Sequence, residues 1–290
     1  MKKSDRNITI VVLIIVGIII IGSFTSVNWS RQQSSGLSRG DVVVIDIKGV
    51  IGSAEKIATQ INEQRRNSNI KGMILRIDSP GGGSAAFQEL YREVKRFRDA
   101  GKPVVAAIAS VGASGGYYAA LGASEIVANP ASVTGSIGVI VDFPVAVELL
   151  AKIGLSVETI KSGEYKDVGS PYREFTTEDE AQLETVIQDI YNQFVNAVAL
   201  ERKIDKKKLL KIADGRIFTG SQALEYGLID TLGTFEDAVM MIGKLTGIDG
   251  RPKLVFPQKK SKTLFDLLFT GIDELFSLFA PIPTLNYLWR

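Results

Sequence analysis

Ser114 is the residue of this chain whose surroundings point most clearly to chemistry. It lies in the segment Gly112–Tyr118, between alanine and glycine, after the apolar run Val104–Ala109. Small neighbours let a substrate backbone approach a serine hydroxyl at the end of a buried strand, although they also suit a tight packing turn. The chain has no histidine and no cysteine. Ser114 therefore cannot belong to a Ser-His-Asp triad, and as a nucleophile it needs a different general base.

A lysine is the usual replacement for the missing imidazole, and Lys166, in the segment Lys161–Asp167, is the candidate. A lysine base must be neutral, so its pKa must fall from about 10.4 toward the working pH, as burial in apolar surroundings makes it do. Tyr165 and Val168 could supply such surroundings. Asp167 should face elsewhere, because a carboxylate close to the amine would keep it charged. The alternative is an ordinary exposed lysine in a polar loop.

Two further segments place glycines and hydroxyl groups after strands. Ser79–Gly83 reads Ser-Pro-Gly-Gly-Gly, and its backbone N–H groups could bind an oxyanion or a phosphate. No nucleotide-binding spacing accompanies it. In Asn129–Gly138, Thr134 or Ser136 could orient an amine through a hydrogen bond. A turn without catalytic function is the alternative for both segments.

The elements that must position these residues alternate between strand and helix from residue 41 onward. Continuous apolar strands indicate a parallel sheet covered on both faces, and ligands bind beyond the carboxyl ends of such strands. Both glycine-rich segments follow predicted strands. Thr177–Glu180 reads as a capping box that opens a long helix. The sequence predicts strands over 42–47, 72–77, 103–109 and 125–128, and helices over 54–66, 85–99, 116–121, 177–204, 205–212 and 235–245.

Composition excludes several classes of function. The chain has 290 residues, of which 45% are hydrophobic, and a net charge of +2. This length allows one sizeable α/β domain or two small ones, and the lack of an internal repeat favours a single copy of the catalytic domain. The charge is too small to indicate nucleic-acid binding. Without histidine and cysteine the commonest metal ligands are missing, so no metal and no cofactor is expected.

The two ends of the chain differ from the rest. Residues 8–27 are apolar and long enough to span a membrane, and the basic residues within 1–7 place that end in the cytoplasm. We expect a single-pass anchor in contact with membrane lipid, a linker over 28–40 and an extracytoplasmic domain. A cleaved signal peptide is the alternative, but no Ala-x-Ala site follows. The apolar tail of residues 251–290 is expected to pack on the domain or on a neighbouring copy, so deletion after Thr263 should reduce the size of the assembly.

Taken together, these segments resemble the signal peptide peptidase A family, also called protease IV type, in its short single-domain form. The likeness covers residues 42–247. The resemblance implies a ClpP/crotonase-like α/β fold with a repeated β-β-α superhelical core, here preceded by one transmembrane helix, and a serine peptidase domain over 41–250. Five segments carry the likeness, in the family's order: Ser79–Gly83, Ala113–Tyr118, Thr134–Gly138, Lys161–Asp167 and Gly215–Gly233.

The resemblance also implies a role for each site residue. Ser114 matches the nucleophile, Lys166 the general base, and Ser136 the hydroxyl that hydrogen-bonds the lysine. Gly82 and the N–H of Gly115 match the oxyanion hole. Family members cleave hydrophobic peptides, notably remnant signal peptides, and assemble as homo-oligomeric rings. In short-form relatives the serine and the lysine can come from neighbouring protomers, and a monomer would then be inactive.

Two other functions fit parts of the sequence. A crotonase-like acyl-CoA enzyme would hold an enolate with its glycine N–H groups and would move protons with acidic residues, but an extracytoplasmic domain would not meet coenzyme A. A membrane-anchored scaffold with an inactive site would bind other membrane proteins through residues 264–290. The presence of both Ser114 and Lys166 favours the peptidase over the scaffold.

Overall fold

A computed structural model describes residues 41–257 and 286–288 of the chain, and the expected membrane anchor and most of the apolar tail lie outside these ranges. Within them, no helix is long and apolar enough to cross a membrane. The described strands are β1 (Val42–Lys48), β2 (Gly72–Ser79), β3 (Gly81–Gly83), β4 (Val104–Ala113), β5 (Glu125–Ala128), β6 (Val133–Gly135), β7 (Ile217–Thr219), β8 (Thr231–Leu232), β9 (Leu254–Val255) and β10 (Asn286–Leu288).

The helices alternate with these strands, as the sequence predicted. A short 3-10 helix, η1, covers Glu164–Asp167. The long helix begins at Thr177, as predicted, but its capping box lies one residue earlier than expected: Thr176 and Asp179 form the box, not Thr177 and Glu180. The α-helices are α2 (Glu55–Arg66), α3 (Ser84–Asp99), α4 (Gly115–Ala120), α5 (Val147–Lys152), α6 (Thr177–Arg202), α7 (Lys206–Leu209), α8 (Gly220–Glu225) and α9 (Phe235–Leu245).

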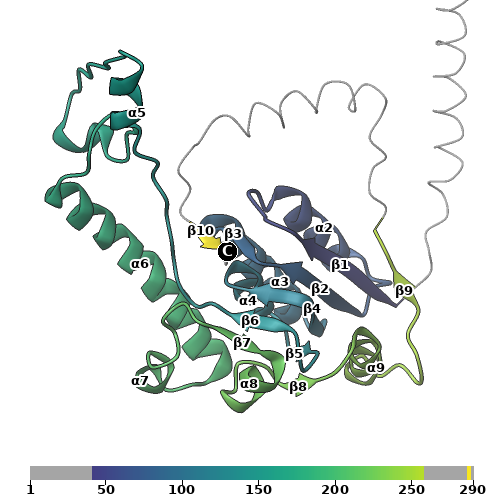
Figure 1. The fold of residues 1–290 in the computed structure, drawn as a ribbon. Coiled ribbons are helices and arrows are strands. Elements are labelled where there is room, and N and C mark those ends of the chain that lie inside the picture. The colour runs from purple at the N-terminus through teal and green to yellow at the C-terminus, as the bar shows by residue number, and fades with distance from the viewer. Residues whose placement is uncertain (1–40, 258–285, 289–290) are drawn as a thin grey trace, which may run out of the picture. The chain divides into compact units, whose positions relative to one another are not determined.

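One mixed, mainly parallel sheet forms the centre of the described chain (Figure 1). Its strands follow the order β7-β6-β4-β2-β1-β9, with β5 beside β4 and β8 beside β5. Among the described strands of this sheet, only the β6–β7 pair is antiparallel. The parallel-rich α/β architecture predicted from the sequence is therefore confirmed, and it fits the ClpP-like fold that the resemblance implies.

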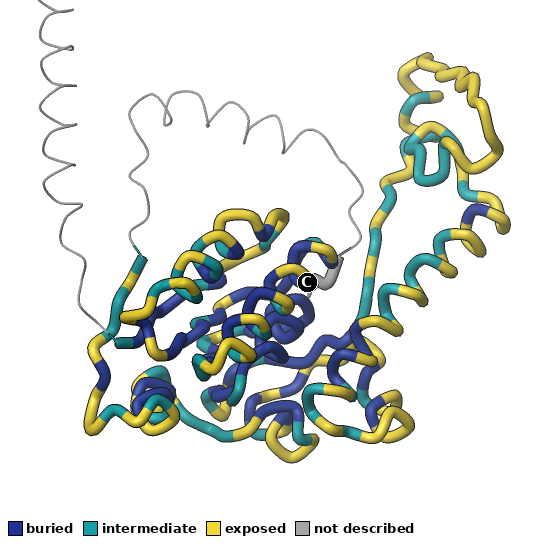
Figure 2. Tube along the Cα trace, turned by 180° about the vertical axis from the view of Figure 1, so that it is seen from behind, coloured by how far each residue is buried: buried dark blue, intermediate teal, exposed yellow. Residues whose placement is uncertain are grey.

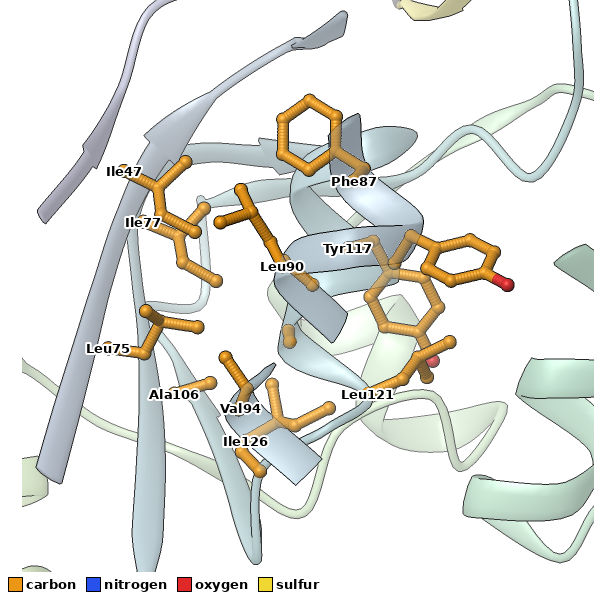
Figure 3. Packing of buried hydrophobic residues seen from close by; sticks show 14 of the residues in the cluster. Ile47, Leu75, Ile77, Phe87, Leu90, Val94, Ala106, Tyr117, Leu121 and Ile126 are labelled. Atoms are coloured by element: carbon orange, nitrogen blue, oxygen red, sulfur yellow. The ribbon is translucent and has the colours of Figure 1, made fainter. Parts of the chain in front are cut away.

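The core lies on both faces of the sheet because side chains alternate along each strand. On one face, Val43, Ile45 and Ile47 of β1 pack with residues from α2, α3, α4 and α6. Figure 3 shows this face, where Leu90 and Val94 of α3 lie against the strands. On the other face, the alternate residues of β1 and β2 pack against α9. Continuous apolar strands thus reflect burial on both sides.

Residues 140–176, which we call the arm, are the main part of this domain that lacks a packed core. They include α5 and η1 and lead into the outer end of α6, away from the sheet (Figure 1). Figure 2 shows the arm mostly in the colours of exposed and intermediate residues. Its exposed large hydrophobic residues are Ile140, Val145, Leu149, Ile153, Leu155, Val157, Ile160, Tyr165 and Tyr172.

Candidate active site

Ser114 occupies a strained turn between β4 and α4. Its backbone torsions are φ 52° and ψ −117°, a combination that favours glycine. The turn is held on both sides: the Ser114 N–H donates to the Gly135 carbonyl at 2.8 Å, and the Ser114 carbonyl accepts from the Tyr118 N–H at 2.9 Å. Strain of this kind costs about 1–3 kcal/mol and collects at functional sites. A serine kept in this conformation is therefore a candidate nucleophile on structural grounds as well.

The glycines next to Ser114 also satisfy close packing. A Cβ at Gly115 would lie 2.2 Å from the Phe87 ring, and one at Gly116 would lie 2.7 Å from the Ser79 carbonyl oxygen. The tight packing turn that the sequence allowed as an alternative is therefore present. It does not exclude a catalytic role for this turn, because the N–H of Gly115, as the first residue of α4, has no partner within its own helix.

The Ser-Pro-Gly-Gly-Gly segment lies beside the Ser114 turn because β2 and β4 are neighbours, with Ser79 paired to Gly112. The Ser79 hydroxyl donates to the Gly49 carbonyl at 2.6 Å and accepts from the Gly81 N–H at 3.2 Å. Gly82 has φ 150°, and a Cβ there would lie 2.2 Å from the Ile51 carbonyl oxygen. Only glycine fits this position, so the loop has a defined shape, as its proline suggested.

Strand β3, which contains Gly82, pairs with an extended segment of the same chain. β10 runs antiparallel to it, with Tyr287 opposite Gly82. The edge of β3 therefore carries an extended segment of the chain, beside the turn that holds Ser114. Sequence reasoning did not find this pairing, because three residues near the C-terminus carry no signal for a partner some 200 positions earlier.

Ser136 is brought to the same end of the sheet. β6 pairs with β4 so that Gly135 lies beside Ala113. Ser136 follows Gly135, is buried, and also has a positive φ, 49°. Its N–H donates to the Arg216 carbonyl at 2.8 Å. Ser114, Gly115, Gly82 and Ser136 thus lie on neighbouring strand ends, as ligand-binding residues do in sheets of this type.

Lys166 does not join these residues within one chain. It lies on η1 in the arm and is exposed to solvent, whereas Ser114 is 1% exposed at the end of β4. The apolar surroundings expected from its neighbours do not form here, since Tyr165 is itself 49% exposed. A lysine base needs apolar surroundings, so this exposed position within one chain does not by itself supply them.

The Asp167 carboxylate is held by two cations other than Lys166. Arg173 Nη2 donates to Asp167 Oδ1 at 2.9 Å, and Lys161 Nζ donates to the same oxygen at 2.8 Å. The hydrogen bond from Arg173, followed by that from Lys161, holds the pKa of Asp167 well below its usual range. Sequence reasoning missed Arg173, because it follows Asp167 in a segment for which the sequence predicts no helix or strand.

The described site belongs to a class in which a serine on a strand-to-helix turn is surrounded by backbone N–H donors. Comparison with known proteins assigns the chain to a protein family within this class. Residues 96–249 match peptidase family S49. A protein of Synechocystis sp., named as a candidate protease, is 42% identical over 222 residues, which are 76% of this chain and 79% of that protein.

Other relatives carry more specific names. A protein of Enterococcus faecium, named as a candidate signal peptide peptidase SppA, is 33% identical over 72% of this chain and 64% of its own length. The serine protease SPPA, chloroplastic, of Arabidopsis thaliana is 36% identical over 76% of this chain but only 33% of its own length. The chain belongs to peptidase family S49, the family of signal peptide peptidase A and protease 4, and this membership supports a serine protease.

Proposed function

We propose that the protein is a membrane-anchored serine endopeptidase whose active site is shared between copies of the chain. Ser114 of one copy is the nucleophile, and Lys166 of a neighbouring copy is the general base. The observation that carries this proposal is the contrast between a buried, strained Ser114 among backbone donors and a Lys166 exposed on the arm. Family membership favours the peptidase over the acyl-CoA enzyme and the scaffold.

The arm supports a neighbouring copy as the source of the base. Ile153 and Ile160 are exposed there together with other apolar residues, although apolar side chains gain by burial. A second copy that covers the arm would bury these residues and Lys166 together, and this burial would lower the lysine pKa. An arm that contacts a different surface of the next copy forms a head-to-tail interface, and repetition of such an interface closes a ring.

The chemical steps follow from the roles proposed for these groups. Neutral Lys166 Nζ takes the proton from Ser114 Oγ, and Oγ bonds to the peptide carbonyl carbon. The N–H groups of Gly82 and Gly115 stabilise the resulting oxyanion, an effect worth about 10²–10³ in kcat for each donor. The C–N bond then breaks, and the leaving amine takes the proton from Lys166. Lys166 next deprotonates a water molecule that attacks the acyl-enzyme, and Oγ regains its proton from Lys166. Throughout, Ser136 Oγ accepts a hydrogen bond from a Lys166 N–H and so orients the amine.

The glycine strand supports the choice of substrate. A peptide that adds to the free edge of a strand is held through its backbone, so its binding depends little on sequence. β10 adds to β3 in this way. We propose hydrophobic peptides as substrates, including remnant signal peptides, because one relative is named as a signal peptide peptidase.

A hydrophobic segment ahead of the domain supports a location at the membrane. Residues 8–27 would form one span with a cytoplasmic N-terminus, so the peptidase domain over 41–250 would lie on the extracytoplasmic side. Such a domain would meet peptides that remain in the bilayer after secretion.

The experiment that tests the proposed function is labelling of the assembled protein with a fluorophosphonate, followed by peptide mapping. We expect one adduct, on Ser114, and a loss of labelling in Lys166→Ala. Lys152→Ala, which removes another lysine of the arm, is the matched control and should label at the normal rate. Normal labelling of a Lys166→Ala protein with unchanged oligomeric mass would refute the role of Lys166.

A further inference from the structure

A cluster of four charged residues surrounds the turn that carries Lys166. We call Lys161, Asp167, Arg173 and Asp179 the arm clamp. Lys161 and Arg173 both donate to Asp167 Oδ1, at 2.8 and 2.9 Å, and Arg173 also forms a two-point pair with Asp179. Paired contacts between guanidinium and carboxylate fix direction as well as distance. The clamp therefore joins three separate stretches of chain around one carboxylate.

The turn needs such support because it has little of its own. The 3-10 helix η1 has four residues, and Tyr165 and Lys166 within it are both exposed. Its backbone hydrogen bonds include Lys166 N–H to the Gly163 carbonyl at 3.2 Å. Short 3-10 turns have poor hydrogen-bond geometry and are held mainly by their surroundings. Lys161 supplies part of these, since its Nζ also donates to the Glu164 carbonyl at 2.8 Å.

The clamp connects this turn to a rigid element. Asp179 is the third residue of α6, its side chain is 4% exposed, and it accepts a hydrogen bond from the Thr176 N–H at 3.1 Å. The other end of α6 packs into the domain core through Phe194 and Val198. Through Arg173, the turn that carries Lys166 is therefore tied to the start of a helix whose far end is anchored in the core.

The clamp also has an electrostatic consequence for Lys166. A free carboxylate on the next residue would favour the charged amine and raise the lysine pKa. The side chain of Asp167 is 11% exposed and is paired with two cations. The charged groups around the turn are Glu164 and Asp167 from the turn itself, Lys161 from the segment before it, Arg173 from the loop before α6, and Asp179 from α6.

We propose that the arm clamp is a positioning device for the reaction: it holds Lys166 at a fixed place and cancels the charge of Asp167, so that the lysine can lose its proton. This inference rests on the proposed function, because it assigns a role to residues around the proposed base. Asp167, Lys161 and Arg173 touch no reacting atom in it and act through Lys166.

Two substitutions in the assembled, full-length protein separate the electrostatic role from a merely structural one. The measurement is the second-order rate of Ser114 labelling against pH. Arg173→Gln leaves the Asp167 charge partly uncompensated, so the acidic limb of the profile should move to higher pH. Asp167→Asn leaves two cations beside Lys166, so the limb should move to lower pH. The two shifts should have opposite directions, because like and unlike charges change a pKa in opposite directions. Each shift should be about half a pH unit or more, because a charge within a few ångströms of an amine changes its pKa by about that much or more.

Two further variants serve as controls. Asp167→Glu keeps the negative charge, so the acidic limb of its labelling profile should lie at the same pH as in the unaltered protein. Glu236→Gln breaks an exposed arginine–carboxylate pair with Arg251, distant in sequence from the arm, and should change nothing. The proposal for the clamp is overturned if Arg173→Gln and Asp167→Asn shift the limb in the same direction, or if neither shifts it. Labelling of Ser114 in the unaltered protein would then still support the proposed function. If that protein is not labelled at Ser114, the proposed function itself fails.

Discussion

Replacement of Ser114 by glycine should stabilise the fold while it abolishes labelling. At φ 52° and ψ −117° the serine Cβ is in a region where glycine alone is relaxed. Ser114→Ala removes the same hydroxyl but keeps the Cβ and its strain. Comparison of the two variants therefore isolates the backbone strain from any effect of the missing oxygen.

The expected size follows from two opposing contributions. Relief of the strain contributes about 1–3 kcal/mol. The greater freedom of glycine in the unfolded chain opposes it by about 0.4–1 kcal/mol. From the middles of the two ranges, the glycine variant should thus be about 1.3 kcal/mol more stable than the alanine variant. For a domain of this size each kcal/mol corresponds to about 2–4 °C in Tm.

The assay is thermal unfolding of both variants at equal protein concentration. Neither variant should form the fluorophosphonate adduct, because both lack the serine hydroxyl. Ala119→Gly is the matched control, because Ala119 lies inside α4 and glycine there should destabilise the protein. A Ser114→Gly protein that melts at or below the temperature of Ser114→Ala would refute the claim that this turn stores strain.

Three other outcomes follow from the packing. Gly115→Ala should destabilise the domain by about 1–3 kcal/mol and slow labelling, because its Cβ would lie 2.2 Å from the Phe87 ring; a normal Tm would contradict this. Ile160→Ser should leave the stability of the isolated domain within about 0.5 kcal/mol but reduce the mass of the assembly by light scattering, and an unchanged mass would count against the arm as an interface. Deletion from Asn286 onward should speed labelling several-fold, because β3 loses its partner strand; an unchanged rate would show that β10 does not compete with ligands.

The main elements could be predicted because their signal is local. The apolar run of β1 and the periodic residues of α3 mark their own boundaries, and the predicted helix 235–245 matches α9. The ends of β2 and β4 extend further than predicted. Pairing of Ser79 with Gly112 carries the ladder into glycine-rich sequence that has no apolar pattern.

The cap of α6 shows where local sequence fails to decide. Thr176 and Thr177 each precede an acidic residue by three positions, so either could open the helix. The ion pair between Arg173 and Asp179 accompanies the choice of Thr176 as the capping residue. This contact depends on the path of the arm, which no periodicity reveals.

Within the site, the sequence indicated residue types and the structure supplied their conformation. The position of Ser114 after a strand was predictable, but its positive φ and that of Ser136 were not, since both occur with hydrogen bonds to residues distant in sequence, Gly135 and Arg216. Motif order placed Lys166 among the site residues. It carried no information on whether a lysine from the same chain reaches the serine.

The shared site is tested most directly by mixing two inactive variants. Ser114→Ala and Lys166→Ala, each with a different affinity tag, are expressed together, and assemblies that carry both tags are assayed for labelling and peptide hydrolysis. If serine and lysine come from neighbouring copies, about a quarter of the sites in an evenly mixed head-to-tail ring regain both groups, and activity returns. Mixed assemblies that stay inactive would contradict the shared site.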